Sequence, residues 1–371
     1  RGEGYWLYQQ VQHNVDLMTG PGRNTALEGF DIVLQPGWNL IGSPYPSGVP
    51  IQLEQEYFWG PITYDGSKWV TSITTELAPW GGYAVYNRNQ SASETVTLNA
   101  APGGGLGKDL LAKAEETPPD GWLLQLEVVG RTYGDGLNSI GRLEGASEQL
   151  DYFDNPEPPY VAGFISLAME RPDWGANMPL MTSDIRSLEE NDGVWDMDLH
   201  VKGEQGPITL SYELEGDLPP GNRIVLLDVL TREVHDLLAT GEPLTITDYR
   251  ERFPYHLNVI AGSADYVAYT TEEILASLPS DFALAQNYPN PFNPFTHLRY
   301  SLFRPAKVTL KIFNLLGREV VTLVDGWQDL GHYEVLWNGR DRFGIPVASG
   351  VYFAAYMAEG RIYTRKMVMM K

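Results

Sequence analysis

An oxygen-rich stretch in the middle of the chain has residue types that could bind a metal ion. Gly134-Asp-Gly-Leu-Asn138 is followed by Asp151-Tyr-Phe-Asp-Asn-Pro-Glu-Pro-Pro159. Calcium takes roughly six to eight oxygen ligands from carboxylates and amides, and Gly-rich loops let such side chains converge. The spacing is not that of an EF-hand loop, and the same side chains could instead form hydrogen-bonded turns. The candidate calcium ligands are Asp135, Asn138, Asp151 and Asp154.

Aromatic side chains in the first part of the chain could bind a surface polysaccharide by stacking on the apolar face of a sugar ring. The candidates for this role are Trp59 and Trp69. The alternative is core packing, because Trp38 and Trp80 stand beside turn residues at the ends of expected strands. The sequence leaves both interpretations open.

Patterns that would indicate catalysis are missing from the sequence. The six histidines have no zinc-type spacing, and there is no Gly-x-Ser-x-Gly elbow. The chain contains no cysteine, which excludes disulfides, thiolate metal sites and cysteine nucleophiles. An acidic chain offers many carboxylate pairs, so none stands out as a glycosidase pair. We therefore expect a protein that is not an enzyme and has no resident cofactor.

The charge of the chain is large and unevenly distributed. The formal net charge is −22 at pH 7, which argues against nucleic acid as a partner. Residues 282–371 hold 11 Lys and Arg against 6 Asp and Glu, a net charge of +5. The remaining residues hold 15 basic and 42 acidic side chains, a net charge of −27. This pattern fits a solvated acidic surface, or a basic tail domain that docks on an acidic neighbour.

The composition and the spacing of apolar runs predict an all-β, multidomain chain. Gly, Tyr and Trp are abundant, and short alternating apolar runs are separated by turn residues. We expect β-sandwich domains that end in an immunoglobulin-like C-terminal sandwich. The expected domains are 1–103, 118–278 and 281–371, with a linker at 102–107. Helical stretches are expected at 108–116 and, as one short turn, at 270–276.

The expected strands follow from β-branched and aromatic enrichment bounded by Gly and Pro. Gly4-Tyr-Trp-Leu-Tyr8 echoes Gly82-Tyr-Ala-Val-Tyr86, which suggests a repeat whose first copy is cut by residue 1. We therefore expect that residue 1 is not the start of the gene product. The strands expected in the three domains are 30–34, 38–41, 68–73 and 82–86, then 122–129, 196–201, 208–214, 223–228 and 255–260, and then 298–302, 308–313, 319–323, 334–337, 350–356 and 363–369.

The last part of the chain carries several motifs in a fixed order. They are Asn287-Tyr-Pro-Asn-Pro-Phe-Asn-Pro294, Asn314-Leu-Leu-Gly317, Trp337-Asn-Gly-Arg-Asp341 with Gly344, Ser349-Gly-Val-Tyr352, and Lys366-Met367. Together they resemble the C-terminal sorting domain of cargo exported by the type IX (Por) secretion system. The resemblance covers about a quarter of the chain, residues 281–371, and rests on the motif order more than on any single motif.

The resemblance implies a partner and a location. The partner is the type IX secretion machinery, and the location is extracellular or on the outer-membrane surface, often after cleavage of the sorting domain. The residues expected to contact the machinery are Gly350, Tyr352, Lys366, Met367 and Lys371. For the other motif residues we expect fold maintenance: Trp337 fills the core, and Asn338 and Asp341 cap their own loop.

Three functions remain open at this point. The first is a non-catalytic structural or adhesive protein that self-assembles head to tail into an oligomer or filament through its oppositely charged ends. The second is the C-terminal accessory region of a larger secreted hydrolase. The third is a carbohydrate-binding module.

Overall fold

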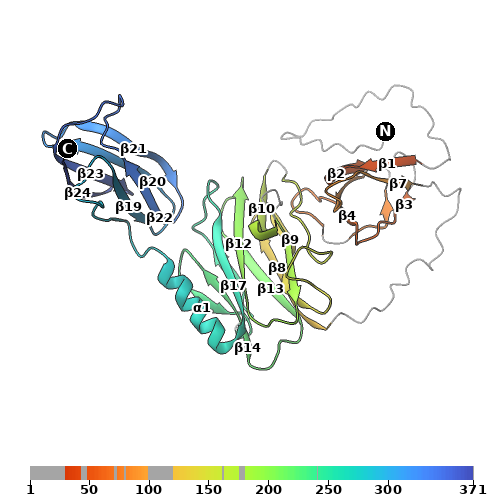
Figure 1. The fold of residues 1–371 in the computed structure, drawn as a ribbon. Coiled ribbons are helices and arrows are strands. Elements are labelled where there is room, and N and C mark those ends of the chain that lie inside the picture. Colours follow the sequence, from red (N-terminus) through yellow and green to blue (C-terminus); the bar gives the residue numbers. More distant parts are fainter. Residues whose placement is uncertain are drawn as a thin grey trace, which may run out of the picture. The chain divides into compact units, whose positions relative to one another are not determined.

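A computed structural model describes residues 30–42, 48–70, 73–78, 81–98, 120–160, 163–174, 180–239 and 241–370. The expected linker at 102–107, the helix at 108–116, the N-terminal echo and Lys371 lie outside these residues. The chain divides into two compact units, one formed by 1–227 with 234–267 and the other by 228–233 with 268–371 (Figure 1). The prediction of an all-β, multidomain chain is confirmed. Among the described helices, none has the length and apolar character needed to cross a membrane.

The first part of unit 1, residues 30–98, is a small β module that we call the N-terminal module. β1 (Phe30–Leu34) pairs with β7 (Glu94–Leu98), and β3 (Val49–Pro50) pairs with β5 (Glu76–Leu77). β6 (Gly82–Asn87) lies between β2 (Gly37–Gly42) and β4 (Phe58–Ile62). Mainly aliphatic side chains form one core, and a second buried cluster contains Trp59, Ile62, Ala84 and Tyr86. Of the strand expected at 68–73, the described residues 68–70 and 73 form no ladder, and a single bridge joins Trp69 to Tyr64.

The second part of unit 1 is a sandwich of two five-stranded sheets, which we call the central sandwich. One sheet has the order β11-β9-β8-β13-β16 and the other β10-β12-β17-β14-β15. Burial alternates along β8 and β12, so each strand turns one face to the core. Trp122 and Trp195 meet edge to face between the sheets, with ring centroids 5.7 Å apart.

The strands of the central sandwich cover the segments that the sequence predicted at 122–129, 196–201, 208–214, 223–228 and 255–260. Their bounds are β8 (Gly121–Val129), β9 (Gly134–Leu143), β10 (Phe164–Ala168), β11 (Ser183–Ser187), β12 (Gly193–Lys202), β13 (Ile208–Gly216), β14 (Asn222–Asp228), β15 (Val234–Asp236), β16 (Leu244–Ile246) and β17 (Tyr255–Ser263). A short 3-10 helix spans Pro172–Trp174.

A helix follows β17 and is longer than the sequence suggested. α1 spans Ala264–Ser277, whereas a single turn was expected at 270–276. The missed start signal is Ser263, whose hydroxyl accepts a hydrogen bond from the Tyr266 backbone N–H at 3.3 Å. A serine that caps the first turn in this way stabilises a helix end. The expectation of one turn was therefore wrong because the cap was not recognised.

The C-terminal sandwich consists of seven strands in two sheets. β18 (Ala283–Leu284), β19 (Thr296–Leu302) and β22 (Gly331–Trp337) form one sheet in the order β18-β19-β22. The other sheet has the order β21-β20-β23-β24. Its strands are β20 (Ala306–Asn314), β21 (Glu319–Gln328), β23 (Gly350–Ala358) and β24 (Arg361–Met369). Side chains from both sheets, Trp337 among them, form one core.

The proline-rich opening segment of this sandwich covers part of an exposed sheet edge. β24 is an edge strand, and its unpaired backbone groups would otherwise be open to another chain. The Phe292 N–H donates to the Val368 carbonyl at 3.0 Å, and the Met370 N–H donates to the Phe292 carbonyl at 3.0 Å. Asn290 Oδ1 accepts from the Val368 N–H at 2.9 Å. The motif at 287–294 therefore acts as an edge cover, which the prolines alone did not reveal.

Removing the Asn290 side chain should weaken this edge cover. Asn290→Ala deletes the bonds to Val368 and to the Lys366 carbonyl. We expect a loss of about 1 kcal/mol of stability, measured by chemical denaturation of the full chain. Lys307→Ala is the control, since Lys307 is exposed on the same sandwich, and its effect should stay within about 0.5 kcal/mol. Equal effects of the two variants would contradict the edge-cover assignment.

Candidate functional site

The N-terminal module contacts the central sandwich at several places, and one of them is the loop of residues 151–157, which we call the acceptor loop. Arg88, just after β6, donates to the backbone carbonyls of Asp151 at 3.1 Å, Asp154 at 2.6 Å and Tyr152 at 2.9 Å. Its guanidinium also donates to Asn155 Oδ1 at 2.8 Å. The planar guanidinium, with several N–H groups in fixed directions, suits such convergent acceptors.

A second contact reinforces this junction. The Trp38 indole N–H donates to the Glu157 carbonyl at 2.9 Å. Arg88 and Trp38 thus contact opposite ends of the same loop. The sequence gave no signal for either role, because a single Arg after a strand and a Trp beside a turn are ordinary features.

The acceptor loop is held in shape by its own carboxylates. Asp154 accepts from the backbone N–H groups of Ile185 at 2.9 Å and Asp151 at 3.0 Å. Asp151 accepts from Ser147 and Phe153, both at 2.8 Å. These bonds are of the kind expected from the alternative interpretation, in which the acidic stretch forms hydrogen-bonded turns.

The four candidate calcium ligands fall into two separate places in the fold. Asp135 and Asn138 lie on strand β9 instead of in a loop, and Asp135 accepts from the Leu167 N–H at 2.9 Å. Asp151 and Asp154 lie in the acceptor loop. Within the described part of the chain, no three or more His, Cys, Asp or Glu side chains gather as a metal site would require. The structure shows oxygens of the three aspartates bonded to backbone N–H groups, and Asn138 Oδ1 accepts from the Thr182 hydroxyl at 3.2 Å.

Burial gives three carboxyl groups near the acceptor loop unusual proton affinities. Burial raises the pKa of Asp154 to about 7, even though two backbone N–H groups favour its charged form. Burial, with the nearby Asp135 charge, raises the pKa of Glu157 well above its usual range. Burial also raises the pKa of Asp135. Glu157 Oε2 is buried and has no hydrogen-bond partner among the described residues.

These shifts predict that unit 1 loses stability as pH rises. A carboxyl whose pKa is higher in the folded state binds more protons folded than unfolded, so its contribution is complete below about pH 4. For Asp154 that contribution is lost as the pH rises through about 7. The midpoint of thermal unfolding should therefore be higher at pH 5 than at pH 8.

Glu157→Gln tests the same effect at one position. The neutral amide has no proton to take up on folding, a cost that Glu157 bears increasingly as pH rises above its unfolded pKa, so the variant should gain about 1–2 kcal/mol at pH 8 and little at pH 5. The matched control is Glu144→Gln, an exposed carboxyl on the same sandwich. A wild-type unfolding temperature that does not change between pH 5 and 8 would contradict the assignment.

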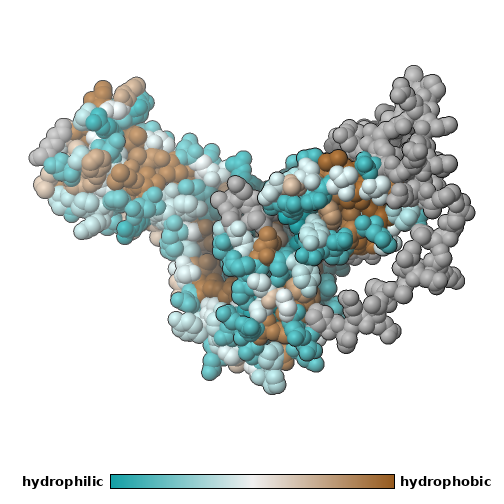
Figure 2. Space-filling view, turned by 45° about the vertical axis from the view of Figure 1, so that its right-hand side comes forward, coloured by the Kyte–Doolittle hydropathy of each residue, from teal (hydrophilic) through white to brown (hydrophobic). Residues whose placement is uncertain are grey.

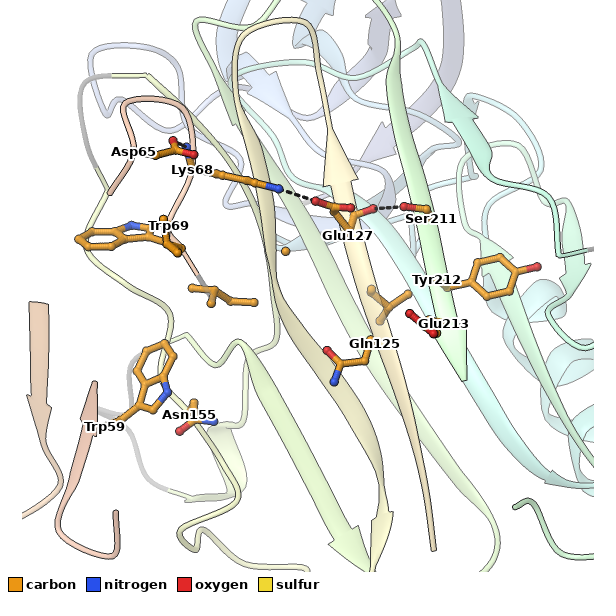
Figure 3. A pocket seen from close by; sticks show the side chains of 14 residues that line it. Trp59, Asp65, Lys68, Trp69, Gln125, Glu127, Asn155, Ser211, Tyr212 and Glu213 are labelled. Carbon is orange, nitrogen blue, oxygen red and sulfur yellow. Dashed lines mark hydrogen bonds and ion pairs between the residues drawn. The ribbon is translucent and has the colours of Figure 1, made fainter. Parts of the chain in front are cut away.

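A cleft lies in unit 1 between the N-terminal module and the central sandwich (Figure 3). Its volume is about 820 Å3, within the roughly 300–1,000 Å3 typical of small-molecule sites. The N-terminal module contributes Trp59, Asp65, Lys68, Trp69 and Val70. The central sandwich contributes Gln125, Leu126, Glu127, Gly136, Leu137, Asn155, Ser211, Tyr212 and Glu213.

Lys68 and Glu127 connect the two sides of the cleft. Lys68 Nζ lies 2.6 Å from Glu127 Oε1, and both side chains are partly exposed. The hydrogen bond and charge of Glu127 raise the pKa of Lys68, which therefore stays protonated. Beside this pair, the Gly134 N–H donates to the Ser67 carbonyl at 3.3 Å.

Both tryptophans proposed for carbohydrate binding line this cleft. Trp59 lies in β4 with only 7% of its surface exposed, and it meets Trp38 edge to face. Trp69 is half-buried and meets Tyr64 edge to face. Trp59 therefore packs in the core of the module and also lines the cleft. Sequence analysis did not identify the polar residues on the opposite side of the cleft, such as Gln125 and Glu213. The only indication in the sequence was that these residues alternate with apolar ones along their strands.

The residues expected to contact an export machinery occupy different environments. Tyr352 and Met367 are buried in the core of the C-terminal sandwich, where Tyr352 meets Trp337 edge to face. Their contribution in the folded domain is packing. Gly350 and Lys366 are exposed, and Lys371 lies outside the described residues. Leu315 and Leu316, in the turn after β20, are 71% and 78% exposed. Both belong to the Asn314–Gly317 motif, but sequence analysis had not named them as contacts for the export machinery.

Arg88→Ala should destabilise unit 1 strongly. The substitution leaves a group of partly buried acceptors without their donor, so we expect a loss of about 2–4 kcal/mol by calorimetry of the full chain. Arg88→Lys should lose nearly as much stability, because a lysine ammonium cannot donate to all four acceptors in the fixed directions of a planar guanidinium. Arg223→Ala, on an exposed side chain of the same unit, should change stability by less than about 0.5 kcal/mol. A small effect of Arg88→Ala would show that other contacts hold the module.

Comparison with known proteins gives little further guidance. No family model and no curated protein matches the chain. PorZ, an essential bacterial surface component of the type-IX secretion system of Porphyromonas gingivalis, is 20% identical with a TM-score of 0.19, over 30% of this chain and 14% of PorZ. Dimeric latent PorU from Porphyromonas gingivalis is 13% identical with a TM-score of 0.21, over 92% of this chain and 30% of PorU. At these values the similarities assign no function to the chain.

Proposed function

We propose that the chain is a non-catalytic adhesive or structural protein, exported by the type IX secretion system, with residues 281–371 as its sorting domain. The observation that carries the proposal is that the ordered motifs fall within one compact sandwich. Asn287 is buried and bonds Thr296 Oγ1 at 2.8 Å, which fixes the opening motif to β19. Trp337 and Met367 meet in the same core.

The motif residues divide into those that build the sandwich and those that it displays. The Asp341 carboxylate accepts from the Phe343 and Ile345 N–H groups, both at 2.9 Å, and so caps its own loop. Leu315, Leu316 and Lys366 stay at the surface. An export receptor could contact these three side chains without unfolding the domain.

Export can be tested in a bacterium that has a type IX secretion system. The full chain, preceded by a signal peptide, should reach the cell surface or medium, and a chain that ends at residue 280 should stay in the periplasm. A reporter fused to 281–371 should also be exported. Export of the chain that ends at residue 280 would contradict the proposal.

The displayed motif residues offer a sharper version of this experiment. Leu315→Ser with Leu316→Ser should lower export at least threefold while the sandwich remains folded by circular dichroism. Ile362→Ser, a hydrophobic side chain exposed to 66% on the same sandwich, is the matched control. Equal export of both variants would remove Leu315 and Leu316 from the recognition surface.

Head-to-tail self-assembly is the second part of the proposal, and charge supports it. Residues 282–371 carry +5 and the remainder carries −27, so unlike ends of two copies attract each other. Such a contact does not close on itself and would extend into a filament. Light scattering at low ionic strength should show assembly that disappears near 0.5 M salt, because salt screens surface charge. A monomer at every ionic strength would contradict this part.

A further inference from the structure

We propose that the cleft of unit 1 binds a neutral oligosaccharide. The inference rests on the proposed adhesive function for its biological setting, and it names the class of ligand and the side chains that recognise it. Three features of the cleft carry it: an aromatic wall, a polar floor and the balance of charge.

The aromatic wall comes from the N-terminal module. Trp59 and Trp69 lie on one side of the cleft, across from strands β8 and β13 (Figure 3). The edge-to-face contact of Trp69 with Tyr64, at a centroid distance of 5.5 Å, holds its ring in place. Trp59 is only 7% exposed and packs on Trp38 at 5.2 Å, so it supports the wall while Trp69 supplies the ring on which a sugar stacks. A ring fixed in advance loses little conformational entropy when a sugar stacks on it.

The polar floor comes from two neighbouring strands of the central sandwich. In the β8–β13 register Glu127 stands opposite Ser211, and Gln125 stands opposite Glu213. Neighbouring strands lie about 4.8 Å apart, and side chains two positions apart on one face are about 7 Å apart. The four side chains therefore form an array on the scale of one or two sugar rings. Amide, carboxylate and hydroxyl groups together offer the donors and acceptors that hydroxyl groups require.

The charge of the cleft selects against anionic ligands. Three carboxylates, those of Asp65, Glu127 and Glu213, face one ammonium, that of Lys68. Lys68 is already paired with Glu127 at 2.6 Å, so no free cation is left among the described lining residues to bind a sulfate, phosphate or uronate. A neutral polyhydroxylated chain can stack on the aromatic wall and hydrogen-bond to the polar floor, and it brings no charge that would need a partner.

The cleft also fits an oligosaccharide better than an apolar peptide. Gln125 and Glu213 are exposed on the floor, and burying them under apolar side chains would leave polar groups without partners. Bridging water and hydroxyl groups avoid this cost. The volume of about 820 Å3 leaves room for more than one sugar ring.

Binding can be measured on the full chain by titration calorimetry. The neutral probes are the hexasaccharides of cellulose, xylan, mannan and chitin, and the anionic probe is hexagalacturonate. We expect at least one neutral hexasaccharide to bind with a dissociation constant between about 1 μM and 1 mM, and hexagalacturonate to bind at least tenfold more weakly. Trp69→Ala should weaken that binding at least tenfold.

Matched variants separate recognition from folding. Gln125→Ala and Glu213→Ala change exposed strand positions and should each weaken binding about threefold to tenfold, with an unchanged unfolding temperature. Tyr57→Ala removes an aromatic side chain that is 47% exposed outside the cleft lining, and it should bind like the wild type. Trp59 is unsuitable as the lead variant, because it is buried and its loss would disturb packing.

Several results would overturn the inference. Absence of binding to every neutral hexasaccharide would contradict the ligand class, as would stronger binding of hexagalacturonate. Unchanged affinity in Trp69→Ala, Gln125→Ala and Glu213→Ala would place the site elsewhere. The export experiment with residues 281–371 does not depend on the cleft, so failure of glycan binding and failure of type IX export are distinguishable.

Discussion

The placement of the N-terminal module against the central sandwich depends chiefly on the contact between Arg88 and the acceptor loop. One guanidinium donates to three backbone carbonyls and one amide oxygen of the same loop. These acceptors converge because Asp151 and Asp154 bond backbone N–H groups and so fix the shape of the loop. The N-terminal module is thereby held against the central sandwich, and the cleft with its aromatic wall and polar floor exists only because the two are held together.

The acidic stretch shows that the same residue types can either bind a metal ion or cap turns by hydrogen bonding. Carboxylates in Gly-rich and Pro-rich loops are suited to calcium and are equally suited to capping turns. Here Asp135, Asp151 and Asp154 each accept backbone N–H bonds, and burial raises their pKa values. Asp154, with a pKa of about 7, is partly protonated near neutral pH, and a protonated carboxyl is a poor ligand for a hard cation, which needs charged oxygens. The same burial couples the stability of unit 1 to pH.

Local patterns predicted some strands and missed others, because alternation along a strand reports only which face is buried. β9, β10 and β11 of the central sandwich were not predicted. β8, β12 and β13 coincide closely with predicted runs, and the C-terminal strands do so as well. The segment 68–73 has the same β-branched and aromatic composition, yet its residues 68–70 line the cleft instead of pairing along a ladder. Whether such a segment forms a strand depends on pairing with residues distant in the chain, and a local sequence pattern carries no information about those partners.

The site was less predictable than the fold for the same reason. Trp59 and Trp69 were found because tryptophan is conspicuous, but Gln125 and Glu213 became neighbours only through the β8–β13 register. Arg88 reaches residues more than sixty positions away in the chain, and nothing in its neighbourhood announces this. In the C-terminal sandwich, by contrast, the ordered motifs indicated one domain, although the edge cover at Phe292 emerged only from the pairing with β24.

The central claim, that Arg88 holds the N-terminal module to the central sandwich, can be tested by one distance measurement. The chain has no cysteine, so spin labels can be attached to Ser91→Cys in the module and Glu190→Cys in the sandwich without background labelling. Both positions are exposed. Double electron–electron resonance should give a single narrow distance distribution, which broadens when Arg88→Ala is added. A broad distribution before Arg88 is replaced, or a narrow one that survives its replacement, would contradict the account.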